Sequence, residues 1–261
     1  MKILIKIGGT LLDEESSRHR LAEEIASLSS RVHQCVVVHG GGKQMTRFLA
    51  DRGIESRFVN GLRVTTPEVL DAVLKVLAGT VNRELVGAFI AAGANAVGIT
   101  GMDAMTTEAE PLSPELGAVG RPVRSDARLL HTLLEHGYLP VMACVAGDRR
   151  GRFYNVNADQ MAVACAVALE VDQLLFLTDV EGVRGHDQEI RPTLTASECE
   201  TLIHDGIATG GMRAKLEAAM DALSRGVAEV VIAPGAVSGV VERLVSGQAL
   251  GTRLVNAGVA A

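Results

Sequence analysis

Short apolar runs alternate with amphipathic stretches along nearly the whole chain, and this alternation restricts the fold more than any other feature. Each run has the length and the aliphatic composition of a strand that is buried on both faces. We expect such strands at residues 2–7, 35–38, 96–99, 139–145, 173–177 and 229–233. The stretches between them carry apolar residues at helical spacing. We expect helices at residues 17–29, 44–52, 67–77, 80–92, 129–135, 159–169 and 212–224. Because strand–helix–strand units join parallel strands by right-handed crossovers, the sequence predicts an α/β fold, a three-layer α/β/α sandwich with a mostly parallel central sheet.

The composition favours a core of small aliphatic side chains. Hydrophobic residues make up 48% of the 261 residues, whereas aromatic residues make up 3% and Trp is absent. This length suffices for one large domain or for two tightly joined lobes. We expect a soft boundary near residue 170, between an N-terminal lobe (residues 1–170) and a C-terminal lobe (residues 171–261).

The charge and the cysteines exclude several classes of protein. A formal net charge of −6 argues against non-specific binding of nucleic acid, which needs a broad positive surface. Membrane insertion is not expected either, because no apolar run is long enough to span a bilayer. The four cysteines lie far apart and form no C-x-x-C pair, and the start of the chain lacks the pattern of a signal peptide. We therefore expect reduced, mostly buried thiols in a cytoplasmic protein.

Two stretches interrupt the alternation of strands and helices. Residues 101–123 are rich in Gly, Pro and Glu, which predicts a hairpin or a loop. Residues 147–154 read G-D-R-R-G-R-F-Y, which is typical of a turn between short strands.

Glycine clusters stand where strand–helix turns are expected, at residues 8–9, 40–42 and 210–211. Ligands of open α/β sheets bind beyond the carboxyl ends of the strands, and exposed N–H groups there suit phosphate or carboxylate oxygens. A single cluster indicates no more than a tight turn, but several clusters on one edge favour a site that handles phosphate. The loop after the second strand is not a Walker A loop, since Lys43 is followed by Gln44. A dinucleotide fingerprint is also absent, because no G-x-G-x-x-G follows a strand.

Two lysines occupy positions that the pattern alone leaves open. Lys6 lies inside an otherwise apolar strand, so its side chain either extends to solvent or serves a site. Lys215 lies near the start of the helix that follows residues 210–211, where a solvated lysine is the simpler interpretation. Arg63 and Asn155 carry no signal of their own.

Seven short motifs occur in a fixed order along the chain. They are K-I-G-G at 6–9, V-H-G-G-G at 38–42, N-G-L-R-V-T at 60–65, A-G-T-V-N at 78–82, N-V-N-A-D-Q at 155–160, T-D-V-E-G-V at 178–183 and G-G-M-R-A-K at 210–215. Together they cover nearly the whole chain and resemble the amino acid kinase family. The third and fifth motifs resemble most closely the branch of that family that phosphorylates N-acetyl-L-glutamate. The resemblance implies ATP-dependent phosphorylation of the γ-carboxylate of N-acetyl-L-glutamate, a step of arginine biosynthesis.

The resemblance also implies roles for single residues. Lys6 and Lys215 match the two lysines that approach the transferring phosphoryl group, and Asp159 matches the aspartate that orients them. Arg63 and Asn155 match contacts to the acyl substrate, and a bidentate guanidinium suits a carboxylate. Backbone N–H groups are expected to meet nucleotide oxygens at Gly8 and Gly9 and substrate oxygens at Gly41 and Gly42. Further nucleotide contacts are expected at Thr178, Asp179, Gly182, Val183, Arg184, Ile207, Ala208, Thr209 and Gly210.

The implied reaction uses ATP with Mg²⁺ as a co-substrate, without a prosthetic group or a dedicated metal site on the protein. A glutamate-like carboxylate has a pKa of about 4.3 and is ionised near neutral pH, so no general base is required. The difficulty is to bring two anions together, and two lysines with backbone N–H groups address it.

The chain departs from the branch in two places. Residues 101–107 replace a stretch that is usually richer in glycine. The sequence also begins a few residues before Lys6, without the N-terminal helix of hexameric members that arginine inhibits. We therefore expect a homodimer without arginine feedback.

Other functions stay open at this point. A relative that acts on aminoadipate or glutamate linked to a carrier protein would share the lysines and the glycine loops, although the intact motif at 60–65 and the net charge of −6 favour a free acetylated substrate. A catalytically silent sensor of an amino acid or nucleotide is another alternative, and a plain α/β binding protein with structural glycines is a third. The joint presence of Lys6, Lys215 and Asp159 favours an enzyme.

Overall fold

An eight-stranded sheet runs through the centre of the molecule in the computed structural model, which describes residues 1–29 and 33–256. Its strands, in spatial order, are β12 (Thr193–Thr195), β14 (Thr252–Val255), β13 (Glu229–Pro234), β11 (Gln173–Thr178), β1 (Lys2–Ile7), β2 (Gln34–His39), β8 (Leu139–Ala143) and β5 (Ala96–Thr100). Every neighbouring pair is parallel except β13 with β14. The predicted mostly parallel sheet is confirmed.

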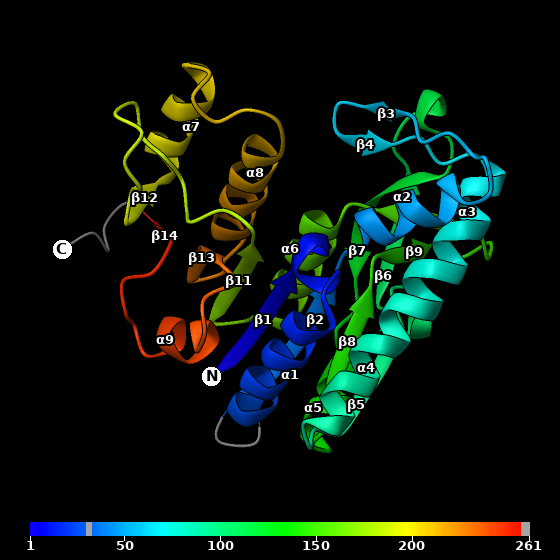
Figure 1. Ribbon diagram of the computed structural model, residues 1–261, viewed down its shortest axis with the longest axis horizontal. Helices are drawn as coiled ribbons and strands as arrows, with labels where there is room; N and C mark the ends of the chain where they lie inside the picture. Colours follow the sequence, from blue (N-terminus) through cyan, green and yellow to red (C-terminus); the bar gives the residue numbers. More distant parts are fainter. Residues whose placement is uncertain (30–32, 257–261) are drawn as a thin grey trace.

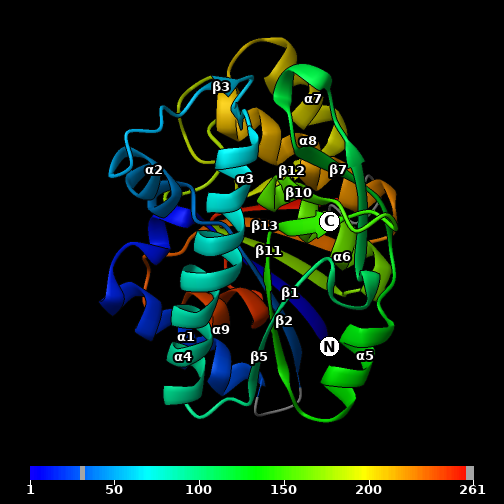
Figure 2. The same ribbon diagram turned by 90° about the vertical axis from the view of Figure 1, so that its right-hand side faces the viewer.

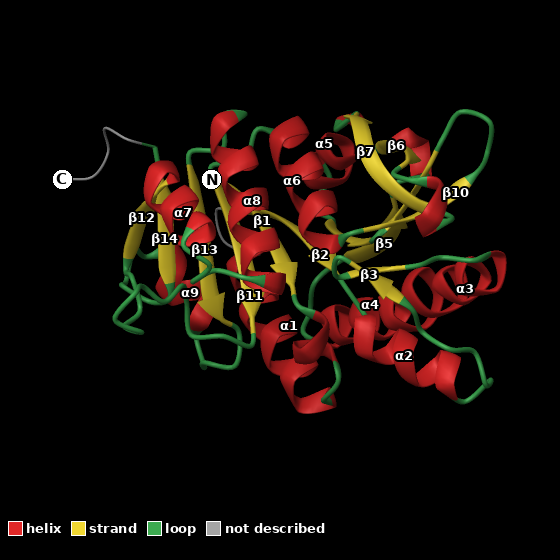
Figure 3. Ribbon diagram, turned by 90° about the horizontal axis from the view of Figure 1, so that it is seen from above, coloured by secondary structure: helices red, strands yellow, loops and turns green. Residues whose placement is uncertain are grey.

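Helices cover both faces of this sheet, as the view from above shows (Figure 3). One face carries α5 (Arg128–Glu135), α6 (Ala158–Leu169), α7 (Ala196–His204) and α8 (Gly210–Ser224). The other carries α1 (Glu15–Ser29), α2 (Gly42–Ala50), α3 (Pro67–Val73), α4 (Asn82–Ala91) and α9 (Val240–Val245). The three-layer sandwich predicted from the sequence is therefore confirmed (Figure 1).

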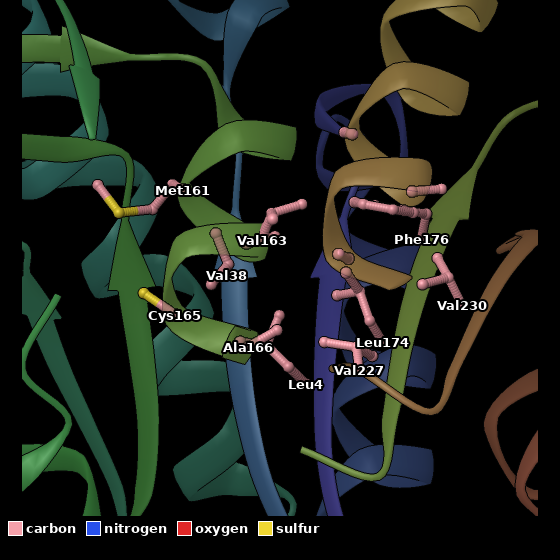
Figure 4. Packing of buried hydrophobic residues seen from close by; sticks show 14 of the residues in the cluster. Leu4, Val38, Met161, Val163, Cys165, Ala166, Leu174, Phe176, Val227 and Val230 are labelled. Atoms are coloured by element: carbon pink, nitrogen blue, oxygen red, sulfur yellow. The ribbon is translucent and has the colours of Figure 1, made fainter. Parts of the chain in front are cut away.

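Successive side chains of each central strand enter different cores, because side chains alternate between the two faces of a strand. In β1, Leu4 packs into the core beneath α6 and α8, whereas Ile5 packs into the core beneath α1 and α4. In β11, Phe176 packs into the same core as Leu4 (Figure 4). Lys6 follows Leu4 by two residues, so the same alternation directs it toward α6 and α8.

A second, smaller sheet lies beside the first. It is a closed barrel of β6 (Thr107–Pro111), β7 (Val119–Ser125), β9 (Val145–Gly147) and β10 (Phe153–Val156). β6 and β7 form an antiparallel hairpin, and β9 and β10 flank the turn at residues 147–154, as the sequence predicts. A separate hairpin of β3 (Phe58–Val59) and β4 (Leu62–Arg63) stands apart from both sheets, at the upper right of Figure 1.

The two helices predicted at residues 67–77 and 80–92 form one unbroken rod, so the predicted break between them is wrong. A π-helical segment, η2 (Leu74–Val81), joins α3 to α4 without a turn (Figure 2). Gly79 lies inside this segment, and a glycine costs a helix only about 1 kcal/mol, which the buried Leu77 and Val81 offset by packing. The strand predicted at residues 139–145 is also divided, into β8 and β9.

Sequence patterns missed four short elements in the C-terminal part of the chain, namely β12, α7, α9 and β14.

The sheet is continuous from β1 to β11, and the lobe boundary near residue 170 stays a prediction. All four cysteines are buried and unbridged, as expected. Short 3₁₀ turns complete the chain at η1 (Gly9–Leu12), η3 (Asp103–Met105) and η4 (Pro114–Leu116). Across residues 1–29 and 33–256, every helix is too short or too polar to cross a membrane.

Candidate active site

Three charged side chains from distant parts of the sequence meet at the carboxyl edge of the sheet. Lys6 Nζ lies 2.8 Å from Asp159 Oδ1, and Lys215 Nζ lies 3.5 Å from Asp159 Oδ2. The side chains of Lys6 and Asp159 are each 8% exposed, and that of Lys215 is 18% exposed. One carboxylate therefore holds two ammonium groups in a largely water-excluded position.

The local structure explains why these three side chains converge. Strand alternation directs Lys6 toward the face that α6 and α8 cover side by side (Figure 1). The side chain of Asn157 caps α6 by accepting from the N–H groups of Asp159 and Gln160, at 2.9 and 3.2 Å. This cap starts the helix at a point that places Asp159 in its first turn, over the end of β1. Lys215 lies in the second turn of α8 and reaches the same point from the other side.

The two ammonium groups determine the charge of Asp159. Burial alone would raise the pKa of its carboxyl group, but the attraction and hydrogen bonds of Lys6 and Lys215 outweigh burial and hold the pKa below its ordinary value. Asp159 is therefore an anion at neutral pH. The cluster as a whole carries one excess positive charge, which is suited to an incoming anion.

Asp159→Asn is expected to lower stability at pH 7 by about 3 kcal/mol, because it leaves Lys6 buried without its anion. The pKa of Asp159 is lower in the folded than in the unfolded protein, so the stabilisation is complete above the unfolded value of about 3.9 and is lost as the pH falls through the folded value. Thermal unfolding of both proteins between pH 8 and pH 3 should show a difference in Tm that shrinks below about pH 4. Glu217→Gln, which breaks an exposed ion pair with Arg213 on α8, is the matched control and should change stability by less than about 1 kcal/mol. A difference in Tm that grows toward pH 3 would contradict this assignment.

The glycine loops after β1 and β2 are in direct contact. A Cβ atom on Gly9 would lie 3.1 Å from the nitrogen of Gly42 and 3.3 Å from that of Gly41. A Cβ atom on Gly8 would lie 3.1 Å from the carbonyl oxygen of Leu177 at the end of β11. These distances are tighter than most Cβ contacts, so glycine favours the close packing of the three strand ends as well as turning the chain.

A cleft beside these loops is lined by the two lysines of the charged cluster. Its lining includes Lys6, Gly8, Gly9, Gly42, Arg63, Thr178, Asp179 and Lys215. Of the predicted catalytic set, Asp159 lies behind the two lysines and does not line the cleft. Within residues 1–29 and 33–256, no group of three or more His, Cys, Asp or Glu side chains is arranged to hold a metal ion.

A pocket of about 190 Å³ opens from one end of the cleft and shares Gly42 and Arg63 with it. Its polar lining includes Asn155, and its apolar lining includes Met45, Leu62, Val73, Leu77 and Val119. All four residues predicted to contact the acyl substrate line this pocket, namely Gly41, Gly42, Arg63 and Asn155.

Arg63 is held by acceptors that sequence reasoning did not find. Its guanidinium donates to Thr46 Oγ1 at 2.9 Å, to the carbonyl oxygen of Gly42 at 3.1 Å, and to Ser56 Oγ. It also lies 4.6 Å from the ring centroid of Phe58. Burial lowers the pKa of Arg63 from its ordinary value, which is high enough to leave the group charged at neutral pH. Serine and threonine are common on protein surfaces, so no sequence pattern distinguishes Ser56 or Thr46 from other polar residues near the motifs.

A larger hollow of about 430 Å³ opens at the other end of the cleft and shares Asp179 with it. Six of the predicted nucleotide residues line it, namely Asp179, Gly182, Val183, Arg184, Ile207 and Ala208. Thr178, Gly8 and Gly9 line the cleft instead. The N–H group of Gly8 donates to the carbonyl oxygen of Leu177 at 2.9 Å, so the donation from Gly8 to a nucleotide oxygen that the sequence predicts is not supported. Thr209 and Gly210 form the start of α8 beyond Ala208 and lie outside the lining of this hollow, so their predicted contact has no support from the geometry.

Comparison with known proteins identifies the family. A family model described as "Amino acid kinase family" matches residues 1–234. The acetylglutamate kinase of Solibacter usitatus is 59% identical over 98% of this chain and 100% of its own length, and that of Acidobacterium capsulatum is 42% identical over 94% and 95%. Among solved structures, N-acetylglutamate synthase from Neisseria gonorrhoeae, complexed with coenzyme A and N-acetyl-glutamate, superimposes with a TM-score of 0.88 at 26% identity. The superposition covers 98% of this chain but only 60% of the synthase. The chain therefore belongs to the amino acid kinase family.

Proposed function

We propose that the protein transfers the γ-phosphoryl group of ATP to the γ-carboxylate of N-acetyl-L-glutamate. One observation carries this proposal: the Lys6–Asp159–Lys215 cluster borders a cleft that joins a small pocket to a larger hollow. A smaller acyl substrate and a larger nucleotide can thus meet where the positive charge is concentrated. The names and the identities of the curated relatives favour this substrate over others of the family.

The chemistry of the proposed reaction is mainly a matter of positioning and charge. The γ-carboxylate is ionised near neutral pH and attacks the γ-phosphorus in line, while the bond from phosphorus to the bridging oxygen of ADP breaks. The attacking carboxylate and the transferring phosphoryl group are both anions, so their approach requires compensating cations. Lys6 and Lys215 supply these cations, and Asp159 keeps both ammonium groups aimed at the cleft.

The small pocket suits an acetylated dicarboxylate. Arg63 offers a planar guanidinium for the α-carboxylate, and Asn155 offers an amide for the acetamido group. The apolar wall suits the methyl group of the acetyl substituent. Gly41 and Gly42 line the same pocket, so their N–H groups are the donors that we assign to the γ-carboxylate.

ATP would occupy the larger hollow with its phosphates directed into the cleft. Mg²⁺ would arrive with ATP as part of this co-substrate and neutralise charge on the phosphate oxygens. Gly8 and Gly9 have room for phosphate oxygens because they carry no side chain. The homodimer, the lack of arginine feedback, the division into lobes and the cytoplasmic location stay predictions.

The proposed function is tested by ADP release with Mg-ATP and a panel of acceptors. N-acetyl-L-glutamate should support turnover, whereas L-glutamate, L-aspartate and N-acetyl-L-aminoadipate should support at least about tenfold less, since each misfits a pocket that encloses its substrate. Turnover only with an acceptor attached to a carrier protein would favour the carrier-linked alternative. Binding of both ligands without turnover would favour a silent sensor.

Thr65→Val is expected to raise KM for N-acetyl-L-glutamate by about three- to tenfold and to leave KM for ATP unchanged, because one lost hydrogen bond is worth about 1 kcal/mol. The buried hydroxyl of Thr65 donates to the carbonyl oxygen of Arg63 at 2.9 Å and accepts from Asn155 Nδ2 at 3.1 Å, so it links the two substrate contacts. Steady-state kinetics with each substrate varied would measure the effect. Thr65→Ser keeps the hydroxyl and should restore KM. A raised KM in Thr65→Ser with an unchanged KM in Thr65→Val would mean that the methyl group matters and the hydroxyl does not.

A further inference from the structure

His39 is a buried titratable residue that the proposed reaction does not use. It ends β2 directly before the glycine loop, and its side chain is 0% exposed. Its Nδ1 atom lies 2.8 Å from the carbonyl oxygen of Gly40, and its Nε2 atom lies 2.9 Å from Asn82 Nδ2. Strand alternation directs His39 to the face opposite Lys6, where α4 begins with Asn82.

The direction of each hydrogen bond from Asn82 through His39 to Gly40 is fixed. Asn82 Nδ2 also lies 2.9 Å from the carbonyl oxygen of Val141, which can only accept, and Asn82 Oδ1 accepts from the guanidinium of Arg83. Asn82 therefore presents an N–H to His39 Nε2, which must be the unprotonated nitrogen. The ring proton is consequently on Nδ1, and it is donated to Gly40.

The surroundings keep the ring in this single state. Burial lowers the pKa of His39 to about 4, which its hydrogen bond to Gly40 opposes and the charge of Arg83 reinforces. The ring is therefore neutral at physiological pH, with one proton. Cys144 Sγ also donates to the backbone carbonyl oxygen of His39 at 2.9 Å, which fixes the strand end itself.

Fixing the carbonyl group of Gly40 also fixes the N–H group of Gly41. The two groups belong to one trans peptide unit, in which C=O and N–H point in opposite directions. Because His39 holds the carbonyl oxygen on the α4 side, the N–H of Gly41 points away from that side, toward the loop that contains Gly9. The position that a Cβ on Gly9 would take is 3.3 Å from the nitrogen of Gly41.

Close packing also restricts the position of Asn82, at the other end of this series of hydrogen bonds. Gly98 of β5 lies against Asn82, and a Cβ on Gly98 would collide with Asn82 Oδ1 and with a guanidinium nitrogen of Arg83. Leu77 of the π-helical segment packs on Gly41, where an added Cβ would lie 2.5 Å from its Cδ2 atom. The rod that carries Asn82 thus confines the loop on two sides.

We propose that His39 and Asn82 are positioning residues, which aim the backbone N–H of Gly41 at the carboxylate of the acyl substrate through the carbonyl group of Gly40. This inference rests on the proposed function, since it assigns a purpose to the N–H group at that site. Neither side chain touches the substrate. A histidine that merely fills the core would need neither a defined tautomer nor a donor at Nδ1.

Two substitutions of His39 distinguish a positioning role from mere filling of the core, because each keeps a neutral amide in place of one ring nitrogen. His39→Asn places an amide near the position of Nδ1 and can still donate to Gly40. His39→Gln places its amide near the position of Nε2 and cannot. We expect kcat with N-acetyl-L-glutamate to fall by about three-fold or less in the first variant and by about 10- to 100-fold in the second, with KM for ATP within about twofold in both. If His39→Gln is as active as His39→Asn, the proposal is overturned.

A second measurement does not depend on turnover, and its first part uses only the wild-type protein. In the ¹⁵N-labelled wild-type protein, long-range ¹H–¹⁵N spectra should show that His39 carries its proton on Nδ1 and that Nε2 is unprotonated. A proton on Nε2 would overturn the proposal. In His39→Gln, the amide signals of Gly41 and Gly42 should shift, whereas they should stay close to wild type in His39→Asn. If the protein proves inactive with N-acetyl-L-glutamate, the proposed function fails, and these spectra still decide whether His39 positions the loop.

Discussion

Lys6→Met is expected to lower kcat by about 10²- to 10³-fold while KM for either substrate changes by less than about fivefold. Met is close to Lys in volume and suits a buried strand, so β1 should keep its packing. The substitution removes an ammonium group that acts on the charge of the transferring phosphoryl group. Since this charge rearranges most in the transition state, the loss should appear in kcat. Initial rates with both substrates varied would separate kcat from the two KM values.

Lys75→Met is the control for the loss of a lysine. Lys75 lies on the rod of α3, η2 and α4, its side chain is 63% exposed, and it pairs with Asp71. Its replacement should therefore leave kcat and both KM values unchanged. A Lys6→Met variant with normal kcat and a raised KM would contradict the role given to Lys6. It would mean that this lysine binds substrate and transition state equally well.

Arg63→Lys is expected to raise KM for N-acetyl-L-glutamate by about 30- to 100-fold and to change kcat by less than about fivefold. Lysine keeps the positive charge but lacks the planar fork that grips a carboxylate. Its three N–H donors equal the three bonds that Arg63 already makes within the protein, to Thr46, Ser56 and the carbonyl oxygen of Gly42, so none would be left for the substrate. Calorimetric titration with N-acetyl-L-glutamate, together with steady-state kinetics, would measure the loss. KM for ATP should stay within about twofold, because the guanidinium lies at the opposite end of the cleft from the nucleotide hollow.

Arg57→Lys is the matched control from the same segment. Within residues 1–29 and 33–256, the carbonyl oxygen of Glu115 is the single acceptor of its guanidinium, at 3.3 Å on the surface, so its replacement should have little effect on either substrate. If Arg63→Lys weakens both substrates equally, Arg63 supports the fold of the cleft and does not recognise the acyl group.

The sheet and the direction of Lys6 could be predicted from the sequence because they depend on local periodicity. Alternation along β1 places Lys6 on the face opposite Ile5, and the apolar runs identify the strands on either side. The meeting of Lys6 with Asp159 could not be predicted from pattern, because more than 150 residues separate them and only the crossover of α6 brings them together. For this contact the sequence offered a resemblance to a family and no physical signal.

The rod of α3, η2 and α4 shows where local reasoning fails. Gly79 resembles a helix stop, yet packing of Leu77 against the glycine loop keeps the chain helical through it. The link between His39 and Asn82 depends on the same rod, since the π-helical segment sets the rotation at which α4 begins. A histidine and an asparagine 43 residues apart carry no pairing signal until that rotation is known.

The central claim, phosphoryl transfer to the γ-carboxylate, is tested most directly by an isotope measurement. N-acetyl-L-glutamate labelled with ¹⁸O only in its γ-carboxylate would be incubated with enzyme, Mg-ATP and hydroxylamine, and the released phosphate analysed by mass spectrometry. Hydroxylamine attacks the carbonyl carbon of an acyl phosphate, so the bridging oxygen leaves with phosphate. We predict that each phosphate carries one ¹⁸O atom and that label in the α-carboxylate alone gives unlabelled phosphate. Unlabelled phosphate from the γ-labelled substrate would contradict the account, because the phosphoryl group would then have passed to water.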